Sequence, residues 1–278
     1  MAPLPDVGTD ALLEYSWANV RNLCLFSFVI DTTLRGDFVA YVAKQALDGK
    51  QDYKEQDPAE LAKRDPGPST QALRRHSQEL LEMFVSRIVD NFEVYLVKII
   101  RLVLHSEPRI LSDRKKELTL GDILKFDSID ALSRDIIEGK VAALSQRGFG
   151  EIESWCAHKS IPLVVPFNQR QRVVELIALR NIIVHNRGYV DERYRTAVST
   201  SPHKLGEKKQ LNVDDLFAAV ELLDSVANAT DAAVSTKYRL STVNVHEEIM
   251  TRSAELWPDP VEAEQQLSAD NAPEETEC

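Results

Sequence analysis

Glycine and cysteine are scarce in this chain, and each shortage excludes a class of protein. The 10 glycines among 278 residues are roughly half the usual share, which disfavours the barrels, sandwiches and dinucleotide folds that need glycine in turns and phosphate loops. The three cysteines lie more than a hundred residues apart and form no CxxC pair, so neither a disulfide scaffold nor a zinc ribbon is available. We therefore expect an all-α protein in a reducing, cytoplasmic setting, with no metal site and no cofactor.

Long apolar runs are also missing. The most apolar stretch, residues 23–30, is far shorter than the roughly 20 residues that a membrane span needs, and residues 1–10 lack the basic segment of a signal peptide. The sequence therefore predicts no membrane partner. Its apolar content of 44% is nevertheless sufficient for a hydrophobic core.

Negative charge dominates the chain but is unevenly distributed. The formal net charge is -11, and residues 253–278 hold eight acids and no lysine or arginine, which leaves -3 for the rest. Residues 167–195 carry six arginines against three acids. The distribution indicates a nearly neutral body with one basic segment and an acidic tail.

Composition and hydrophobic periodicity divide the chain into four parts. We expect a helical extension over residues 1–48, interrupted near Gly36, a linker over 49–70, a helical domain over 71–242 and a disordered acidic tail over 243–278. The periodicity within the domain predicts helices over residues 71–105, 129–144, 169–184 and 212–237. The third of these is apolar on nearly all sides, which predicts a place in the middle of an antiparallel bundle.

Three polar residues interrupt the end of this apolar helix: Arg180, Asn181 and His185. Asn181 and His185 are four residues apart and share a helix face, and the Arg180 side chain can reach the same turn. A histidine that titrates near neutral pH and an arginine that binds phosphate oxygens could cleave a ribose phosphodiester through its own 2'-hydroxyl, without a metal. The reaction needs both a base and an acid, but the motif holds a single histidine. We therefore expect a twofold homodimer, which brings together two copies of the three residues.

An arginine and a histidine at this spacing can also occur by chance. A second match, Arg239 with His246, has Leu240 after the arginine where a polar residue would be expected. The first match differs because a polar residue follows its arginine, an apolar helix carries it, and Gly188 suits a left-handed helix stop.

This segment, ELIALRNIIVHNRGYVDERY, resembles the signature of the HEPN superfamily, in which four to six residues separate an arginine, usually followed by Asn, from a histidine. It is similar to the RiboL-PSP-HEPN branch and related nucleases of prokaryotic defence and toxin systems, over about residues 71–239. The resemblance implies a helical bundle, a dimer with a composite cleft, and metal-independent endoribonuclease activity that leaves a 2',3'-cyclic phosphate and a 5'-hydroxyl. It implies RNA as the substrate, a toxin or antiviral defence function, and catalytic roles for Arg180, Asn181 and His185.

The resemblance leaves the regulation of the protein open. Some toxin members are controlled by an antitoxin, or by a nucleotidyltransferase that modifies a tyrosine two positions after the histidine. This chain has Arg187 at that position, and Tyr189 is displaced. An antitoxin or nucleotidyltransferase partner is therefore an expectation from the family and not from the motif of this chain.

The remaining basic residues have two interpretations. They could bind the RNA backbone or be ordinary solvated positions; the set is Arg170, Arg172, Arg187 and Arg193. The lysines of the following loop, Lys204, Lys208 and Lys209, are expected at the surface. The alternative to an enzyme is a non-catalytic dimerisation or adaptor module, in which the three motif residues form a structural cluster paired with Glu175 or with an acid on the long helix such as Glu93.

Overall fold

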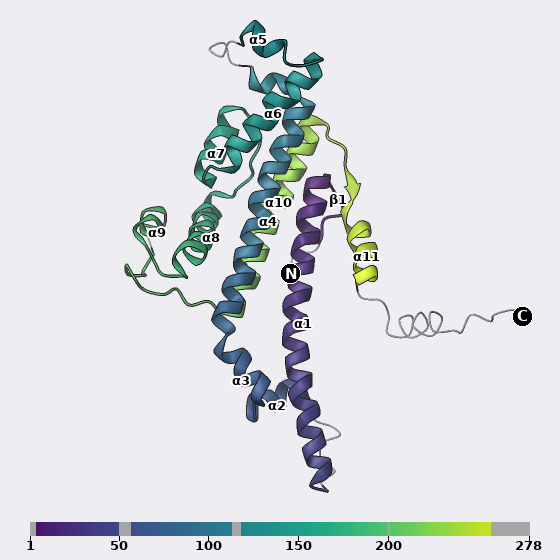
Figure 1. The fold of residues 1–278 in the computed structure, drawn as a ribbon, viewed down its shortest axis with the longest axis vertical. Helices are drawn as coiled ribbons and strands as arrows, with labels where there is room; N and C mark the ends of the chain where they lie inside the picture. Colours follow the sequence, from purple (N-terminus) through teal and green to yellow (C-terminus); the bar gives the residue numbers. More distant parts are fainter. Residues whose placement is uncertain (1–3, 50–56, 113–117, 200, 257–278) are drawn as a thin grey trace, which may run out of the picture.

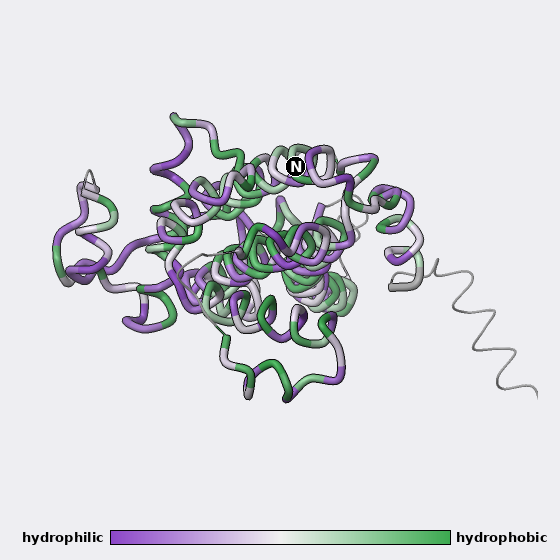
Figure 2. Tube along the Cα trace, turned by 90° about the horizontal axis from the view of Figure 1, so that it is seen from above, coloured by the Kyte–Doolittle hydropathy of each residue, from purple (hydrophilic) through white to green (hydrophobic). Residues whose placement is uncertain are grey.

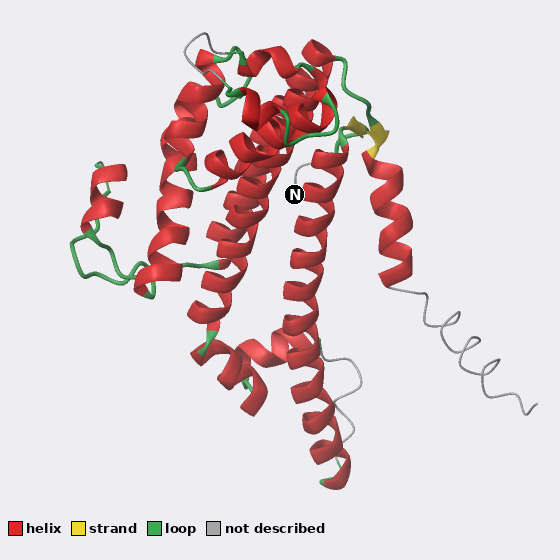
Figure 3. Ribbon diagram, turned by 45° about the horizontal axis from the view of Figure 1, so that its top comes forward, coloured by secondary structure: helices red, strands yellow, loops and turns green. Residues whose placement is uncertain are grey.

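The computed structural model describes residues 4–49, 57–112, 118–199 and 201–256, and helices dominate it (Figure 1). The elements in chain order are β1 (Val7–Gly8), α1 (Asp10–Leu47), α2 (Pro58–Arg64), α3 (Pro68–Arg75), α4 (Ser77–Ser106), the short 3-10 helix η1 (Pro108–Leu111), α5 (Leu120–Ile123), α6 (Ile129–Ser145), α7 (Phe149–His158), α8 (Phe167–Asn186), α9 (Glu192–Ala197), α10 (Val213–Tyr238), β2 (Val243–Asn244) and α11 (Val245–Leu256). The two short strands pair with each other (yellow in Figure 3). The all-α prediction is therefore confirmed for the described residues, among which no helix has the length and apolar composition to cross a membrane.

Helix α4 forms the centre of the structure. It contacts α1, α6, α8 and α10, and most of its apolar side chains are fully buried. The helices around it are amphipathic, so both hydrophobic and hydrophilic positions appear around them in the view from above (Figure 2). Helix α8 lies on one flank of α4, which makes the predicted central place of this segment wrong. The residues of α8 contact α4, α7, α9 and α10, and Val184 is still 54% exposed.

Contacts along α4 fix the directions of its neighbours. Phe26 of α1 packs on Phe84, and Tyr15 packs on Tyr95, with ring centroids 5.2 and 5.5 Å apart, so α1 runs antiparallel to α4. Helix α10 runs parallel to α4, because Tyr95 donates to the carbonyl of Ala227 (3.0 Å) near the middle of both helices and Ser106 to that of Tyr238 (3.2 Å) near their ends. The predicted antiparallel arrangement is therefore wrong for α10. The reason is that the chain returns through α5 to α9 to the start of α4 before α10 begins.

Helix α1 runs unbroken from Asp10 to Leu47, so the predicted interruption near Gly36 is wrong. A glycine inside a helix costs about 1 kcal/mol, and local contacts offset this cost. The Asp37 carboxylate accepts the backbone N–H groups of Ser69 (3.1 Å) and Thr70 (2.7 Å) in the first turn of α3. The N-terminal half of α1 shares the main hydrophobic core with α4 and α10.

The predicted disordered tail is wrong over residues 243–256, which form β2 and α11; residues 257–278 lie outside the described residues. Val245 and Ile249 are four residues apart and therefore share one face of α11. Both are at most 1% exposed and pack with Leu13 of α1. Two apolar side chains at this spacing are sufficient to dock the helix, although charged residues surround them in the sequence.

Replacing Ile249 by aspartate should release α11 from α1, because a charged carboxylate would replace a fully buried apolar side chain. We expect amide hydrogen exchange over residues 245–256 to accelerate at least about tenfold, while exchange in α4 stays unchanged. The matched control is Met250→Asp, whose side chain is 57% exposed. Equal exchange rates in the two variants would contradict the docking of α11.

Candidate functional site

Helix α8 ends in a left-handed turn. Arg187 (φ 54°) and Gly188 (φ 79°) are both left-handed, and the backbone N–H groups of both donate to the carbonyl of Ile182. A Cβ atom on Gly188 would lie 2.9 Å from Oε1 of Glu82, so only glycine fits there without displacing that carboxylate. The predicted left-handed stop at Gly188 is confirmed, although it begins one residue earlier.

The Arg180 side chain crosses from α8 to α4, where two carboxylates hold it. Its Nε donates to Oδ1 of Asp90 at 2.6 Å, Nη2 lies 2.6 Å from the same oxygen, and Oε2 of Glu93 is 3.5 Å from Nη2. The side chain remains 26% exposed, against 34% for Asp90 and 30% for Glu93. The guanidinium is therefore fixed in place and still open to solvent on one side.

Asn181 and His185 lie on the exposed face of the same helix. The Asn181 Oδ1 accepts a hydrogen bond from Nη1 of Arg180 at 3.1 Å, which links the first two motif residues. His185 follows Asn181 by one helical turn and is exposed, and its imidazole makes no hydrogen bond or ion pair with any described residue. The three side chains therefore sit around one end of α8, with a fixed cation, an amide and an unengaged titratable ring.

The charge of this site depends on Glu93. Burial raises the pKa of its carboxyl; the Arg180 guanidinium lowers it and the Asp90 carboxylate raises it, and the net shift is upward. When Asp90 and Glu93 are both ionised, the site has one more negative charge than the single positive charge of Arg180 balances. A raised pKa means that protonation removes part of this excess at a higher pH than for an ordinary glutamate.

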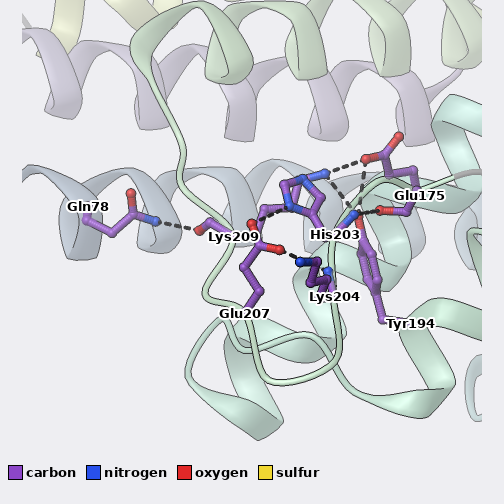
Figure 4. A network of polar contacts seen from close by, with 8 residues as sticks. Gln78, Glu175, Tyr194, His203, Lys204, Glu207 and Lys209 are labelled. Atoms are coloured by element: carbon purple, nitrogen blue, oxygen red, sulfur yellow. Dashed lines mark hydrogen bonds and ion pairs between the residues drawn. The ribbon is translucent and has the colours of Figure 1, made fainter.

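The structure separates the two acids that were alternatives for pairing with Arg180. Glu93 lies beside Arg180, but Glu175 belongs to a different cluster, shown in Figure 4. Lys209 forms an ion pair with Glu175 and donates to the Tyr194 hydroxyl at 2.9 Å, and that hydroxyl donates to Glu175 at 3.2 Å. Burial raises the pKa of Glu175, but the hydrogen bond from Lys209 lowers it, and the net shift is downward.

The loop lysines are more engaged than the sequence predicted. The Lys209 side chain is only 14% exposed, and the Lys208 ammonium lies 3.2 Å from Oε1 of Glu82 on α4. Their expected surface position is therefore wrong for Lys209, because the loop after α9 folds back over α8 and α4. In the same loop Glu207 accepts from the backbone N–H of Lys204 at 2.9 Å (Figure 4).

The arginines expected to bind RNA are not gathered around the motif. Arg170 lies ten residues before Arg180, about 15 Å along the helix, and its guanidinium is engaged by both carboxylate oxygens of Glu153 at 2.6 to 2.9 Å. Arg172, Arg187 and Arg193 are exposed and make no side-chain hydrogen bond or ion pair with a described residue. Of these, Arg187 is the nearest in sequence to His185.

In the part of the chain that the structure describes, no group of three or more His, Cys, Asp or Glu side chains is arranged to hold a metal ion. Comparison of this chain with protein-family models, with curated proteins and with solved structures finds no match. The HEPN resemblance therefore remains a prediction that rests on the residues of α8.

Proposed function

We propose that this protein is a metal-independent endoribonuclease of HEPN type, active as a homodimer. In the proposed reaction the 2'-hydroxyl of a ribose attacks the adjacent phosphate, the 5'-oxygen leaves, and the products are a 2',3'-cyclic phosphate and a 5'-hydroxyl. The observation that carries the proposal is the exposed, unengaged imidazole of His185 one helical turn from the linked pair of Arg180 and Asn181. The proposed biological role is that of a toxin or antiviral defence effector in the cytoplasm, with an antitoxin or nucleotidyltransferase as a further partner.

Each side chain has a separate task in this reaction. His185 removes the proton of the 2'-hydroxyl or supplies one to the leaving oxygen, since imidazole is suited to both transfers near neutral pH. A guanidinium has five N–H donors, and Asp90, Glu93 and Asn181 leave at least one on Nη1 of Arg180 for a phosphate oxygen. Asn181 is exposed, so its amide can orient the same phosphate.

A second copy of the chain would supply the second imidazole. Val184, next to His185 on α8, is 54% exposed, and Val94 on α4 is 51% exposed. Exposed apolar side chains next to a functional face are typical of protein interfaces. A twofold axis close to His185 would place the two rings on opposite sides of one phosphate.

The second candidate function is a non-catalytic dimerisation or adaptor module. It is favoured by the engagement of Arg180 with Asp90 and Glu93, because a structural ion pair needs no substrate. The adaptor module does not explain why the His185 imidazole makes no hydrogen bond or ion pair with a described residue. The two candidates differ in whether RNA is ever cut.

The test is to incubate the purified full-length protein with total RNA in the presence of EDTA and to analyse the new ends. Fragments with a 2',3'-cyclic phosphate and a 5'-hydroxyl are the expected result. RNA that stays intact under all conditions, or cleavage that requires a divalent metal, would overturn the proposal.

Glu93→Gln should increase the affinity for RNA at neutral pH by about threefold to fivefold, because it removes one negative charge beside the phosphate site and a half-exposed charge pair contributes at most about 1 kcal/mol. Wild-type affinity should rise as the pH falls toward the raised pKa of Glu93, and the glutamine variant should lose this rise. The measurement is RNA binding at fixed salt in a His185→Ala background, which is expected to prevent cleavage of the RNA during the measurement. Glu79→Gln, an exposed position on the same helix, is the control. Identical pH profiles for the wild-type residue and glutamine at position 93 would contradict phosphate binding at Arg180.

A further inference from the structure

A groove of about 580 Å³ lies between α1 and α4. Its apolar wall consists of Leu25 and Phe28 from α1 with Met83 and Phe84 from α4. Leu25, Phe28 and Met83 are 49% to 50% exposed, so about half of their surface is open to solvent. An apolar recess with this exposure on a folded domain is typical of a binding surface.

The charged residues of the groove are all arginines. Arg21 of α1 and Arg87 of α4 line it, and neither makes a hydrogen bond or ion pair with a described residue. No carboxylate is among the described residues that line the groove, so these residues give it two positive charges without a negative one. Asn22 also lines it, and its Nδ2 is buried without a hydrogen-bond acceptor. The groove therefore favours a ligand with anionic groups and apolar faces.

One lining residue of the groove, Arg87, is close in the sequence of α4 to the proposed catalytic site. Arg87 lies three residues before Asp90 and so shares its side of the helix, and Asp90 holds the guanidinium of Arg180. The backbone positions of Arg87 and Asp90 are therefore about 4.5 Å apart along the axis of α4. Successive phosphates of one RNA strand could therefore contact both Arg87 and Arg180.

We propose that this groove binds the unpaired bases of single-stranded RNA, with Arg21 and Arg87 on the phosphates that flank the scissile one. This inference rests on the proposed function and names the form of its substrate. Bases present apolar faces that can pack on the apolar wall of the groove. In a duplex the base faces are stacked on one another, so double-stranded RNA would leave the apolar wall unused.

The test measures binding without cleavage, by fluorescence anisotropy with a 2'-O-methyl oligoribonucleotide, which lacks the attacking hydroxyl. Arg87→Ala and Arg21→Ala should each weaken binding about tenfold, as expected for a lost charge-assisted contact. Each should also lower the slope of log affinity against log salt by about 0.7. Arg35→Ala is the matched control on α1, because Arg35 is already ion-paired with Asp31 at 2.6 Å. Wild-type affinity and salt slope in both groove variants would overturn the inference.

Cys24 provides a local probe, because it lines the groove and is a free, half-buried thiol. Cys156 is buried, and burial raises the pKa of its thiol to about 12, so it should not compete for an alkylating reagent. In a Cys278→Ser variant, a saturating single-stranded oligonucleotide should slow alkylation of Cys24 at least about tenfold, since only the free protein reacts. A duplex of the same sequence should protect Cys24 much less; equal protection by the two, or none by either, would place the RNA elsewhere.

The failure of this inference can be distinguished from failure of the proposed function. If RNA is cut but Arg21 and Arg87 do not affect binding, the groove assignment is wrong and the catalytic proposal stands. If binding depends on both arginines but RNA is never cut, the groove binds RNA in a non-catalytic module.

Discussion

Replacing His185 by alanine is expected to lower the rate of RNA cleavage at least about a hundredfold, because general acid–base catalysis by a positioned side chain contributes at least that factor. The melting temperature should stay unchanged, since the ring is exposed and engages no described residue. The measurement is single-turnover cleavage of a defined RNA in EDTA, together with thermal unfolding of both proteins. A loss of rate without a loss of stability would assign the imidazole to the chemistry.

His246→Ala is the control for this experiment. His246 is also exposed, and it belongs to the second arginine–histidine match in the sequence. In the structure Arg239 is the left-handed residue after α10, whereas His246 lies on α11, so the two do not share a helix end. Wild-type cleavage by His246→Ala and by His185→Ala alike would show that the motif in α8 has no catalytic role.

Arg180→Ala distinguishes the enzyme from the adaptor module less cleanly. Removing the guanidinium would leave Asp90 and Glu93 beside each other without a cation. Like charges at this spacing on a helix are destabilising, so the variant should lose stability as well as activity. The exposed His185 is for this reason the better position for the decisive experiment.

The largest effect on stability is expected from Asp231→Ala. The Asp231 side chain on α10 accepts the backbone N–H of Thr9 at 2.9 Å and its hydroxyl at 2.6 Å, and the residue is only 1% exposed. Thr9 is the N-cap of α1, so this contact fixes the start of α1 against α10. Alanine would leave both donors buried and unpaired, at a cost of about 2 to 4 kcal/mol. For a chain of this size the melting temperature should fall by about 6 to 12 °C.

Glu221→Ala is the matched control, because it removes an exposed carboxylate from the same helix. Its melting temperature should stay within about 2 °C of the wild type, as for an ordinary surface substitution. If the two variants melted at the same temperature, the contact of Asp231 with Thr9 would not hold the fold together.

The pH dependence of stability has a definite sign at this contact. Burial raises the pKa of Asp231, although its hydrogen bonds with Thr9 lower it in part, so the folded protein binds the proton more tightly than the unfolded chain. Stability from this group is therefore largest at acidic pH and is lost as the pH rises through the raised pKa. Burial raises the pKa values of Asp224 and Glu93 as well. Asp231→Ala should accordingly reduce this dependence without abolishing it, as measured by chemical unfolding at several pH values.

Local patterns predicted the long helices after residue 70 well. The apolar spacing of three and four along residues 212–237 matches α10, and its predicted start is confirmed by a reciprocal cap between Asn212 and Asp215. The predicted helix over residues 71–105 is correct in extent but is divided at His76 into α3 and α4. These features depend on interactions within a few residues, which a sequence displays directly.

The site was predictable only in part. The sequence placed Arg180, Asn181 and His185 on one helix end, and it indicated Glu175 or an acid on the long helix, such as Glu93, as the partner of Arg180. It did not indicate Asp90, which makes the closer contact, because nothing in the spacing of α4 shows which of its faces meets α8. Arg21 and Arg87 were overlooked for the same reason, since they lie 66 positions apart in the sequence and meet only where α1 crosses α4.

By itself, the sequence determined that the chain is helical, where the long helices after residue 70 lie, and which short segment carries an arginine, an amide and a histidine together. Only the tertiary structure decided that α4 and not α8 is central, that α10 runs parallel to α4, that α11 docks on α1, and that Arg180 is held while His185 is not. The physical reason is the distance along the sequence over which each kind of interaction acts. Helix formation and capping are settled between residues at most four positions apart, whereas burial and ion pairing depend on which faces the whole chain brings together.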